Sequence, residues 1–558
     1  MKDVEPVSVE GRIKIPYRWP AGRLGTRFLA ALRDEGKILA VSCEACQLPH
    51  VPPRPNCLVC GKAMTQWTPA APKGTLLAWT RRRDALFGIV LLDDAWTSMV
   101  HRILDADPAS LSAGERVEVV LAERRVGSIL DIRGFRLTGG GRHSVYPWVA
   151  RELMATTNAS LRRVPGAHDP ATMRPVAVLG AAQTRHTARR SDANYAELAF
   201  EVVQALLARS GLTHDRIDTV VTASSDFWDG RTISDMAVQD AVGAARKSAS
   251  KVSMDGVFAL AYAAARVNSG AYKTCLVVAH GKASEGDPRW ISAAAFDPVF
   301  ERPLGLDDHA ALGLQASEWT LDSRHGNSMT ITELARAAAD AWNHAAANPN
   351  AHRRSARTAA QILESDRVAD PLHADMIAPD SDGACAVLLA DEETGRRLGA
   401  SVWLDGFACA THPHPLADGL LGSLRLHELV RQAGATAGLH PQSLAEPGFQ
   451  GLPRVDDVDT AARVLAGLPP YTGIDVAEVH DASSLQTILW RRALGLGPGV
   501  LYNESGGAMG AQPGFATGLV RVAEVYERLA RGEGKVGLAH GQTGFVGQAH
   551  GVWILRRR

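Results

Sequence analysis

The chain has 558 residues, more than a single hydrophobic core usually organises, so two or three domains are expected. Its 60 basic and 60 acidic residues cancel, which argues against nucleic acid or a membrane surface as the main partner. No apolar run reaches the ~18–20 residues that span a bilayer, and the first residues lack the basic-then-apolar pattern of a signal peptide. These features predict a cytoplasmic protein without a membrane segment.

Four of the seven cysteines form two C-x-x-C pairs, Cys43 with Cys46 and Cys57 with Cys60. Each pair can form a knuckle that offers two thiolates, and the short loop between the pairs is rich in proline. Four cysteine ligands leave no open coordination position, so the pattern predicts a structural zinc ribbon. A short amphipathic helix is expected before it, within residues 12–36.

Short apolar segments separated by turns follow the cysteines, at residues 75–80, 89–92 and 117–121. Such short strands are typical of a small β-barrel, and they complete a first domain of residues 1–138. Residues 139–172 begin with three glycines and contain several prolines, so they are interpreted as a linker.

Apolar strands and helices alternate after the linker, which predicts a parallel sheet covered by helices. The expected elements are strands at 176–180, 219–222 and 275–279 and a helix at 194–209. The pattern restarts after residue 402, with strands at 476–479 and 552–555. Two similar α/β halves are therefore predicted, at residues 173–398 and 399–558.

The stretch from Lys251 to Gly270 is interpreted as a strand that turns sharply into a buried helix. Ser253 is expected at the helix cap and Asp255 in the first turn, at the positive end of the helix dipole. Gly270 is expected to close the helix. Two interpretations stay open here: a well-capped core helix, or a turn that presents a side chain to a substrate.

The ribbon and barrel, over about residues 20–140, resemble the DUF35 family, in which a rubredoxin-like zinc ribbon is joined to an OB-fold. OB-folds often bind nucleic acid. Neutral charge and few aromatic residues favour the family's other habit, association with an acyl-CoA enzyme.

Residues 174–558 resemble the thiolases related to sterol carrier protein X. The motifs that carry the resemblance are Asn343–Pro349 (N-x-A-x-x-N-P), Ser381–Ala386 (S-D-G-A-A-A), Glu478–Ala482 (H-D-x-F), Asn503–Gly507 (N-P-S-G-G) and Gln512–Gly518 (H-P-x-G-A-T-G). The resemblance implies an α/β thiolase fold of two pseudo-repeated halves and a coenzyme A thioester as substrate.

Two positions depart from the thiolase pattern. The nucleophilic cysteine of the family falls at Ser253, and the histidine of the G-H-P motif falls at Gln512. A serine alkoxide is harder to form than a thiolate, and a glutamine side chain cannot accept a proton. Ordinary cysteine-based thiolysis is therefore disfavoured, and a carbon–carbon bond reaction without an acyl-enzyme is the expected alternative.

The resemblance implies an oxyanion role for His480, beside the substrate thioester oxygen, with Asp481 next to it in the substrate site. A buried core imidazole is the alternative for His480. Asp255 is a candidate replacement base, and a purely structural carboxylate is the alternative.

The last loop of the chain contains His540, where relatives place H-N-x-G-G or a second cysteine. Gly506 and Gly507 supply a turn whose backbone N–H groups can approach a substrate oxygen. A tight turn would require these glycines in any case.

The sequence thus predicts a thiolase-like acyltransferase acting at a carbon–carbon bond of an acyl-CoA. Two alternatives remain: a retro-aldolase on a β-hydroxyacyl-CoA such as a steroid side chain, and a non-catalytic CoA-binding subunit. Structural zinc and a homodimer formed through the thiolase domain are expected, with no nucleic-acid partner. The acyl group, the direction of reaction and the need for a partner chain stay open.

Overall fold

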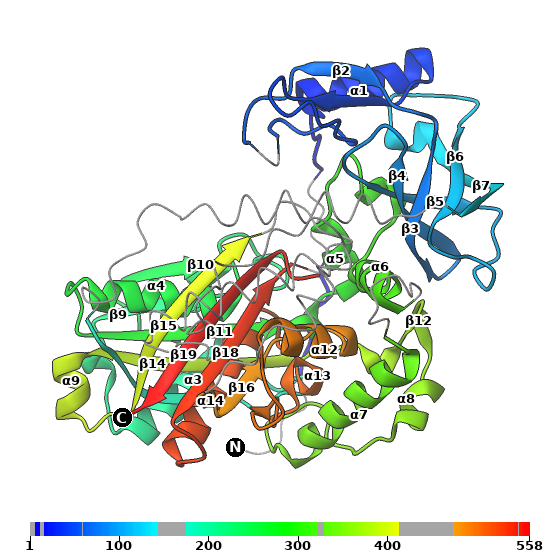
Figure 1. Cartoon of the computed structure of the whole chain (residues 1–558). Helices are drawn as coiled ribbons and strands as arrows, with labels where there is room; N and C mark the ends of the chain where they lie inside the picture. The colour runs from blue at the N-terminus through cyan, green and yellow to red at the C-terminus, as the bar shows by residue number, and fades with distance from the viewer. Residues whose placement is uncertain are drawn as a thin grey trace, which may run out of the picture.

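The computed structural model describes most of the chain: residues 6–11, 16–57, 60–142, 174–320, 329–411, 473–544 and 546–558. A ribbon and a barrel stand together above one side of a larger α/β body (Figure 1). The expected linker lies outside the described residues from residue 143 onward, as do residues 412–472 of the expected second half. Within the described ranges, no helix is long and apolar enough to cross a membrane.

The N-terminal part begins with α1 (Gly22–Glu35), which confirms the expected amphipathic helix and buries Phe28, Leu29 and Leu32. The antiparallel strands β1 (Leu39–Ser42) and β2 (Gln66–Pro69) follow and flank the four cysteines.

The barrel closes in the strand order β3-β4-β5-β7-β6. Its strands are β3 (Lys73–Arg82), β4 (Ala85–Leu92), β5 (Met99–Leu104), β6 (Glu115–Leu121) and β7 (Ile132–Arg142). The third and fifth strands, β5 and β7, pair in parallel, whereas the other neighbours are antiparallel. A five-stranded closed barrel of this kind is an OB-type barrel, as the sequence predicts.

The α/β body contains a ten-stranded sheet, ordered β10-β9-β11-β14-β8-β15-β19-β18-β16-β17. The strands are β8 (Val176–Gln183), β9 (Thr219–Ala223), β10 (Ser248–Val252), β11 (Thr274–Lys282), β14 (Asp382–Asp391), β15 (Val402–Thr411), β16 (Val476–Val479), β17 (Leu501–Tyr502), β18 (Val536–Thr543) and β19 (Ala549–Arg557). Numbered within its own half, each set of five has the order 3-2-4-5-1, and the two first strands, β8 and β15, meet in the middle. The two halves are therefore pseudo-repeats. The sheet is mixed and not parallel as the sequence predicts: β10, β9 and β11 pair in parallel, as do β17, β16 and β18, and the other neighbouring strands are antiparallel.

Two helices at the centre of the body, α4 (Gly256–Asn268) and α14 (Thr517–Ala530), contact each other and strands of both halves. A helix that is covered on several sides needs small side chains, and α4 buries Ala259, Ala263 and Ala264. The outer helix α3 (Tyr195–Ser210) covers β8, β11 and β14. The remaining elements are α5 (Pro288–Ala294), α6 (Asp308–Thr320), α7 (Ile331–Ala347), α8 (Ala359–Glu364), β12 (Arg367–Ala369), β13 (Leu372–His373), α9 (Glu392–Arg397), α12 (Ser484–Ala493) and α13 (Gly507–Gly510).

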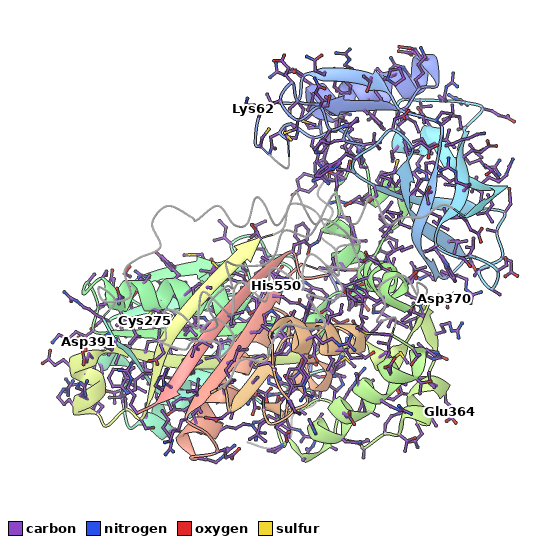
Figure 2. The ribbon with its side chains drawn as sticks, in the orientation of Figure 1. Lys62, Cys275, Glu364, Asp370, Asp391 and His550 are labelled. Carbon is purple, nitrogen blue, oxygen red and sulfur yellow. The ribbon has the colours of Figure 1, made fainter. Side chains whose placement is uncertain are left out.

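The barrel docks on α6 through strand β3. The backbone N–H of Trp79 donates to Ser317 Oγ (3.0 Å), and Thr80 Oγ1 donates to the carbonyl of Asp370 (2.7 Å), a residue at the foot of the barrel (Figure 2). A Cβ at Gly313 would lie 2.4 Å from Thr80 Oγ1, so the glycine permits this close approach. The barrel and the α/β body are thus packed against each other within one chain.

Candidate active site

The turn before α4 differs from the sequence prediction in its cap. Helix α4 begins at Gly256 and its N-cap is Asp255, whose Oδ1 accepts from the backbone N–H of Val257 (3.0 Å). Ser253 lies two residues outside the cap and is exposed, and its hydroxyl has no hydrogen-bond partner among the described residues. Asp255 caps the helix and Ser253 does not, because Asp255 directly precedes Gly256, the first helical residue.

Loops from the second half of the α/β body contact Asp255, which belongs to the first half. Its buried carboxylate accepts from the backbone N–H of Gly518, at the start of α14 (2.9 Å), and lies 3.2 Å from Nδ1 of His480, at the end of β16. The backbone N–H of Asp255 donates to Oγ1 of Thr543, at the end of β18 (2.9 Å). A buried carboxylate with these partners fixes the orientation of the imidazole, and Nε2 of His480 has no partner within the described part of the chain.

His540 lies beside this pair in strand β18, not in a loop as the sequence predicts, and its backbone carbonyl accepts from the N–H of His480 (3.2 Å). Its own ring is fully buried, with Nε2 3.1 Å from Nδ1 of His550. Burial and the nearby His480 hold the pKa of His540 well below its usual range, so this ring is neutral at physiological pH.

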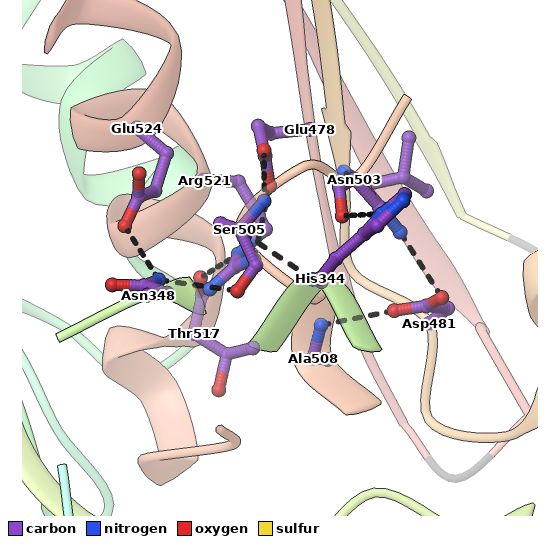
Figure 3. A network of polar contacts seen from close by, with 12 residues as sticks. His344, Asn348, Glu478, Asp481, Asn503, Ser505, Ala508, Thr517, Arg521 and Glu524 are labelled. Atoms are coloured by element: carbon purple, nitrogen blue, oxygen red, sulfur yellow. Dashed lines mark hydrogen bonds and ion pairs between the residues drawn. The ribbon is translucent and has the colours of Figure 1, made fainter. Parts of the chain in front are cut away.

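Asp481 is buried beside the turn of Gly506 and Gly507, and Figure 3 shows its contacts with Ala508 and Asn503. Its carboxylate accepts from the N–H of Ala508 (2.9 Å) and from Nδ2 of Asn503 (3.1 Å). Burial raises the pKa of Asp481 to about 6. Both glycines adopt positive φ, +93° and +60°, and a Cβ at Gly506 would meet the backbone of α7, so this turn requires glycine.

An ion pair lies behind the same turn, between Glu478 and Arg521 (Figure 3). Arg521 Nη1 is 3.1 Å from Glu478 Oε2 and donates to Ser505 Oγ (2.7 Å), and both charged side chains are almost fully buried. A buried pair of this kind, with its hydrogen bonds satisfied, holds β16 against α14.

Among the described contacts, Gln512 makes no hydrogen bond with Asp255 or His480. It forms an isolated parallel bridge with Asp380, and its backbone N–H donates to Ser381 Oγ (3.2 Å). Its buried Oε1 has no hydrogen-bond partner in the described ranges. The structure therefore brings Asp255, His480 and His540 together, and places Gln512 with Asp380 and Ser381.

The four ribbon cysteines have ligand atoms within 4.8 Å of one another, the one group of this kind among the described residues. Cys43 Sγ and Cys60 Sγ lie 3.6 Å apart, too far for a disulfide and close to the roughly 3.8 Å between sulfurs around a tetrahedral zinc. The N–H of Cys46 points at Cys43 Sγ (3.2 Å), as in a metal knuckle. The donor set and its spacing fit a tetrahedral metal ion.

The other three cysteines of the chain lie in strands, Cys275 in β11, Cys385 in β14 and Cys409 in β15. Burial raises the pKa of Cys275 to about 12, so this thiol stays protonated. None of the three follows β10 or ends β18, where thiolases carry their two cysteines by the resemblance above.

Sequence reasoning missed a chain of buried glutamines that leads away from the site. Gln542 Nε2 donates to Gln486 Oε1 (2.7 Å), and Gln486 Nε2 donates to Gln315 Oε1 (3.0 Å) on α6. The three residues are 56 and 171 positions apart in sequence, so local patterns carry no signal of the contact.

The fold and the converging loops define a thiolase-type α/β protein, and comparison with known proteins agrees. The chain is 26% identical over 398 residues to an acetyl-CoA acetyltransferase of Methanothermobacter thermautotrophicus, covering 69% of this chain and 91% of that enzyme. No protein-family model matches.

Two solved structures have the same fold. The Ltp2-ChsH2(DUF35) aldolase matches with a TM-score of 0.53 and 19% identity, over 69% of this chain and 98% of that chain. Human mitochondrial 3-ketoacyl-CoA thiolase matches with a TM-score of 0.51 and 15% identity, over 69% of this chain and 99% of that chain. The chain is thus similar to thiolases in sequence and in fold, and it carries a four-cysteine ribbon and an OB-type barrel in front of its thiolase-type fold.

Proposed function

We propose that this protein makes or breaks a carbon–carbon bond next to the carbonyl of an acyl-CoA thioester, while the acyl group stays on CoA. The pairing of Asp255 with His480 carries the proposal, together with the lack of a cysteine at the site. Ser253, at the nucleophile position, has no base beside it in the described structure, so formation of an acyl-enzyme is disfavoured.

His480 is the electrophilic group in this proposal. Asp255 fixes the orientation of the ring through Nδ1. An N–H at Nε2 can then donate to the thioester oxygen as negative charge develops there. Such a donor stabilises the enolate that forms when a bond at Cα is broken. The neutral, buried His540 beside it adds no competing positive charge.

Aldol-type cleavage of a β-hydroxyacyl-CoA is the form that these groups support best, because it requires an oxyanion donor and a proton acceptor and no nucleophile. The fold shared with the Ltp2-ChsH2(DUF35) aldolase supports this form. Claisen-type acyl transfer is a second candidate, favoured by the acetyltransferase relative. A non-catalytic CoA-binding subunit is the third.

Product analysis separates these functions. The full-length protein is incubated with β-hydroxy- and β-ketoacyl-CoAs of different chain length, with and without free CoA. Release of an aldehyde or ketone plus a shorter acyl-CoA, independent of free CoA, is expected. Cleavage that consumes free CoA stoichiometrically would support the acyl-transfer candidate, and tight CoA binding without turnover would support the binding subunit.

We infer that the ribbon metal is zinc and that it is structural, since four cysteines leave no open position. Metal analysis of the purified protein is expected to give one zinc per chain. Replacing Cys43 and Cys46 by serine should remove the metal and lower the midpoint of thermal unfolding. Full zinc content in that double variant would contradict the assignment.

We also propose a homodimer. Strand β10 forms one end of the ten-stranded sheet, directly before Ser253, and an edge strand can pair with a second copy. Light scattering on the purified chain measures the mass of the assembly, and a monomer at micromolar concentration would contradict the dimer.

A further inference from the structure

The proposed reaction requires a proton acceptor, and Gln512 cannot be one. A single segment, residues 377–381, connects the loop of His480 with the loop of Gln512. At its start, Ile377 forms a bridge with Ser483, and the N–H of Ala378 donates to the carbonyl of Ala482 (3.0 Å). This end of the segment therefore lies against the residues that follow His480.

At its other end the segment lies against Gln512. Asp380 forms the parallel bridge with Gln512, and the N–H of Ser381 donates to the Gln512 carbonyl (3.2 Å). Ser381 Oγ is also 2.9 Å from Nδ1 of His352. The hydrogen bonds on both sides hold Asp380 between the two loops, next to the position where thiolases carry a histidine.

The carboxyl group of Asp380 can be reached from solvent, and its surroundings disfavour its ionised form. Its side chain remains exposed to solvent, yet the surrounding protein and the negative charge of Asp308 raise its pKa to about 7. Asp308 starts helix α6 and accepts from Ser292 Oγ (3.2 Å) and from the N–H of His309 (2.9 Å). A carboxyl with these properties can exchange protons near neutral pH.

The other charged groups around this segment have partners of their own. Asp382, which follows on β14, is buried beside Lys282 at 3.2 Å. The guanidinium of Arg353 donates to the carbonyls of Met509 and Ile377 (3.1 and 2.7 Å). Burial keeps the pKa of His352 below its usual range. Among the described residues, Asp308 on α6 is therefore the charge that most affects Asp380.

We propose that Asp380 is the catalytic proton acceptor of this protein and fills the role left open by glutamine at position 512. The inference rests on the proposed function and assigns the base of that reaction. In cleavage, the Asp380 carboxylate takes the proton of the substrate β-hydroxyl, and the O–H electron pair forms a carbonyl. The Cα–Cβ bond breaks, and its electron pair becomes the enolate whose oxygen is held by His480. Asp380 then returns the proton to Cα, which yields an acyl-CoA and an aldehyde or ketone.

The test compares Asp380→Asn and Asp308→Asn with the wild type in the full-length chain, and uses Asp366→Asn, at another exposed aspartate, as the matched control. Asp380→Asn is expected to lower kcat about 10²–10⁴-fold with little change in KM, and Asp380→Glu to recover part of the loss. Because the base must be ionised, kcat/KM should rise with pH through about 7. Asp308→Asn should move this rise to lower pH, since it removes a like charge, whereas Asp366→Asn should leave the profile unchanged. A kcat within threefold of wild type in Asp380→Asn would overturn the assignment.

A second measurement does not depend on the cleavage substrate. Exchange of the α-hydrogens of acetyl-CoA with D₂O, followed by mass spectrometry, reports on proton transfer at Cα alone. If the wild type cleaves nothing in the panel but catalyses exchange, and Asp380→Asn abolishes it, the base assignment holds and the cleavage reaction is wrong. Exchange that persists in Asp380→Asn refutes the base, and a wild type that neither cleaves nor exchanges refutes both.

Discussion

At the scale of single residues, the site combines positions that the sequence identifies with partners that it cannot. Ser253, His480 and Gln512 follow from the order of motifs along the chain. The contact of Asp255 with His480 spans 225 positions, and only the packing of α4 against the second half creates it. Asp380 lies outside every motif that the sequence analysis identifies. Its bridge with Gln512 and the effect of the Asp308 charge on its pKa both involve segments distant in sequence, so no local pattern indicates them.

Asp481 gives a test of electrostatics at this scale. Its pKa is about 6 in the folded protein and near 3.8 in a free carboxyl, so the native state binds the proton more tightly than the unfolded state. The resulting stability is complete below pH ~4 and is lost as the pH rises through ~6, by about 3 kcal/mol for two pKa units. The free energy of unfolding of wild type relative to Asp481→Asn should therefore fall between pH 4 and 7. A difference that is constant over this range would show that Asp481 ionises normally.

At the scale of elements, the apolar runs that the sequence analysis identifies fall on elements of the structure, among them β8, β9, β11, β16 and α3. The paired 3-2-4-5-1 order of the two halves could not be read from periodicity, since the order of strands in a sheet depends on contacts between distant segments. Helices α4 and α14 show the same limit. Their alanines and glycines indicate close packing, but not that the partner of Gly518 is the carboxylate of Asp255.

Gly518→Ala tests this central packing. A Cβ at Gly518 would lie 1.9 Å from Asp255 Oδ1 and 2.9 Å from Val257, so either the helix or the carboxylate has to shift. We expect a loss of about 1–3 kcal/mol in the free energy of unfolding, measured by urea denaturation, together with loss of turnover. Gly499→Ala, where a Cβ meets open space, is the control and should stay within ~0.5 kcal/mol. Equal stability of the two variants would contradict the packing described here.

At the scale of the whole molecule, helix α6 connects the barrel to the site. Its residue Ser317 contacts the barrel, Gln315 ends the glutamine chain, and the charge of Asp308 raises the pKa of Asp380. The buried apolar cluster is continuous across this contact, from Phe87 in the barrel to Leu314 on α6. The resemblance to DUF35 proteins leads us to expect that the barrel associates with an acyl-CoA enzyme. No local pattern in the sequence indicates that α6 is the helix on which the barrel docks.

A shared core predicts that the barrel and the α/β body unfold together, in one calorimetric transition. Gly313→Ala places a Cβ 2.4 Å from Thr80 Oγ1 and should force the two parts apart. Two separate transitions, and lower activity, are expected for this variant. A single unchanged transition would mean that the contact between β3 and α6 contributes little to the cohesion of the molecule.

Carbon–carbon chemistry at Asp255 and His480 should proceed without an acyl-enzyme, and mass spectrometry of the protein during turnover detects an acyl-enzyme if one forms. The enzyme is quenched while it turns over a β-hydroxyacyl-CoA, and the peptide that carries Ser253 is then sequenced by mass spectrometry. We expect continuing turnover, an unmodified Ser253 peptide and an activity loss of about 10²-fold or more in His480→Ala. An acyl increment on Ser253 that forms and decays at the rate of turnover would contradict this expectation.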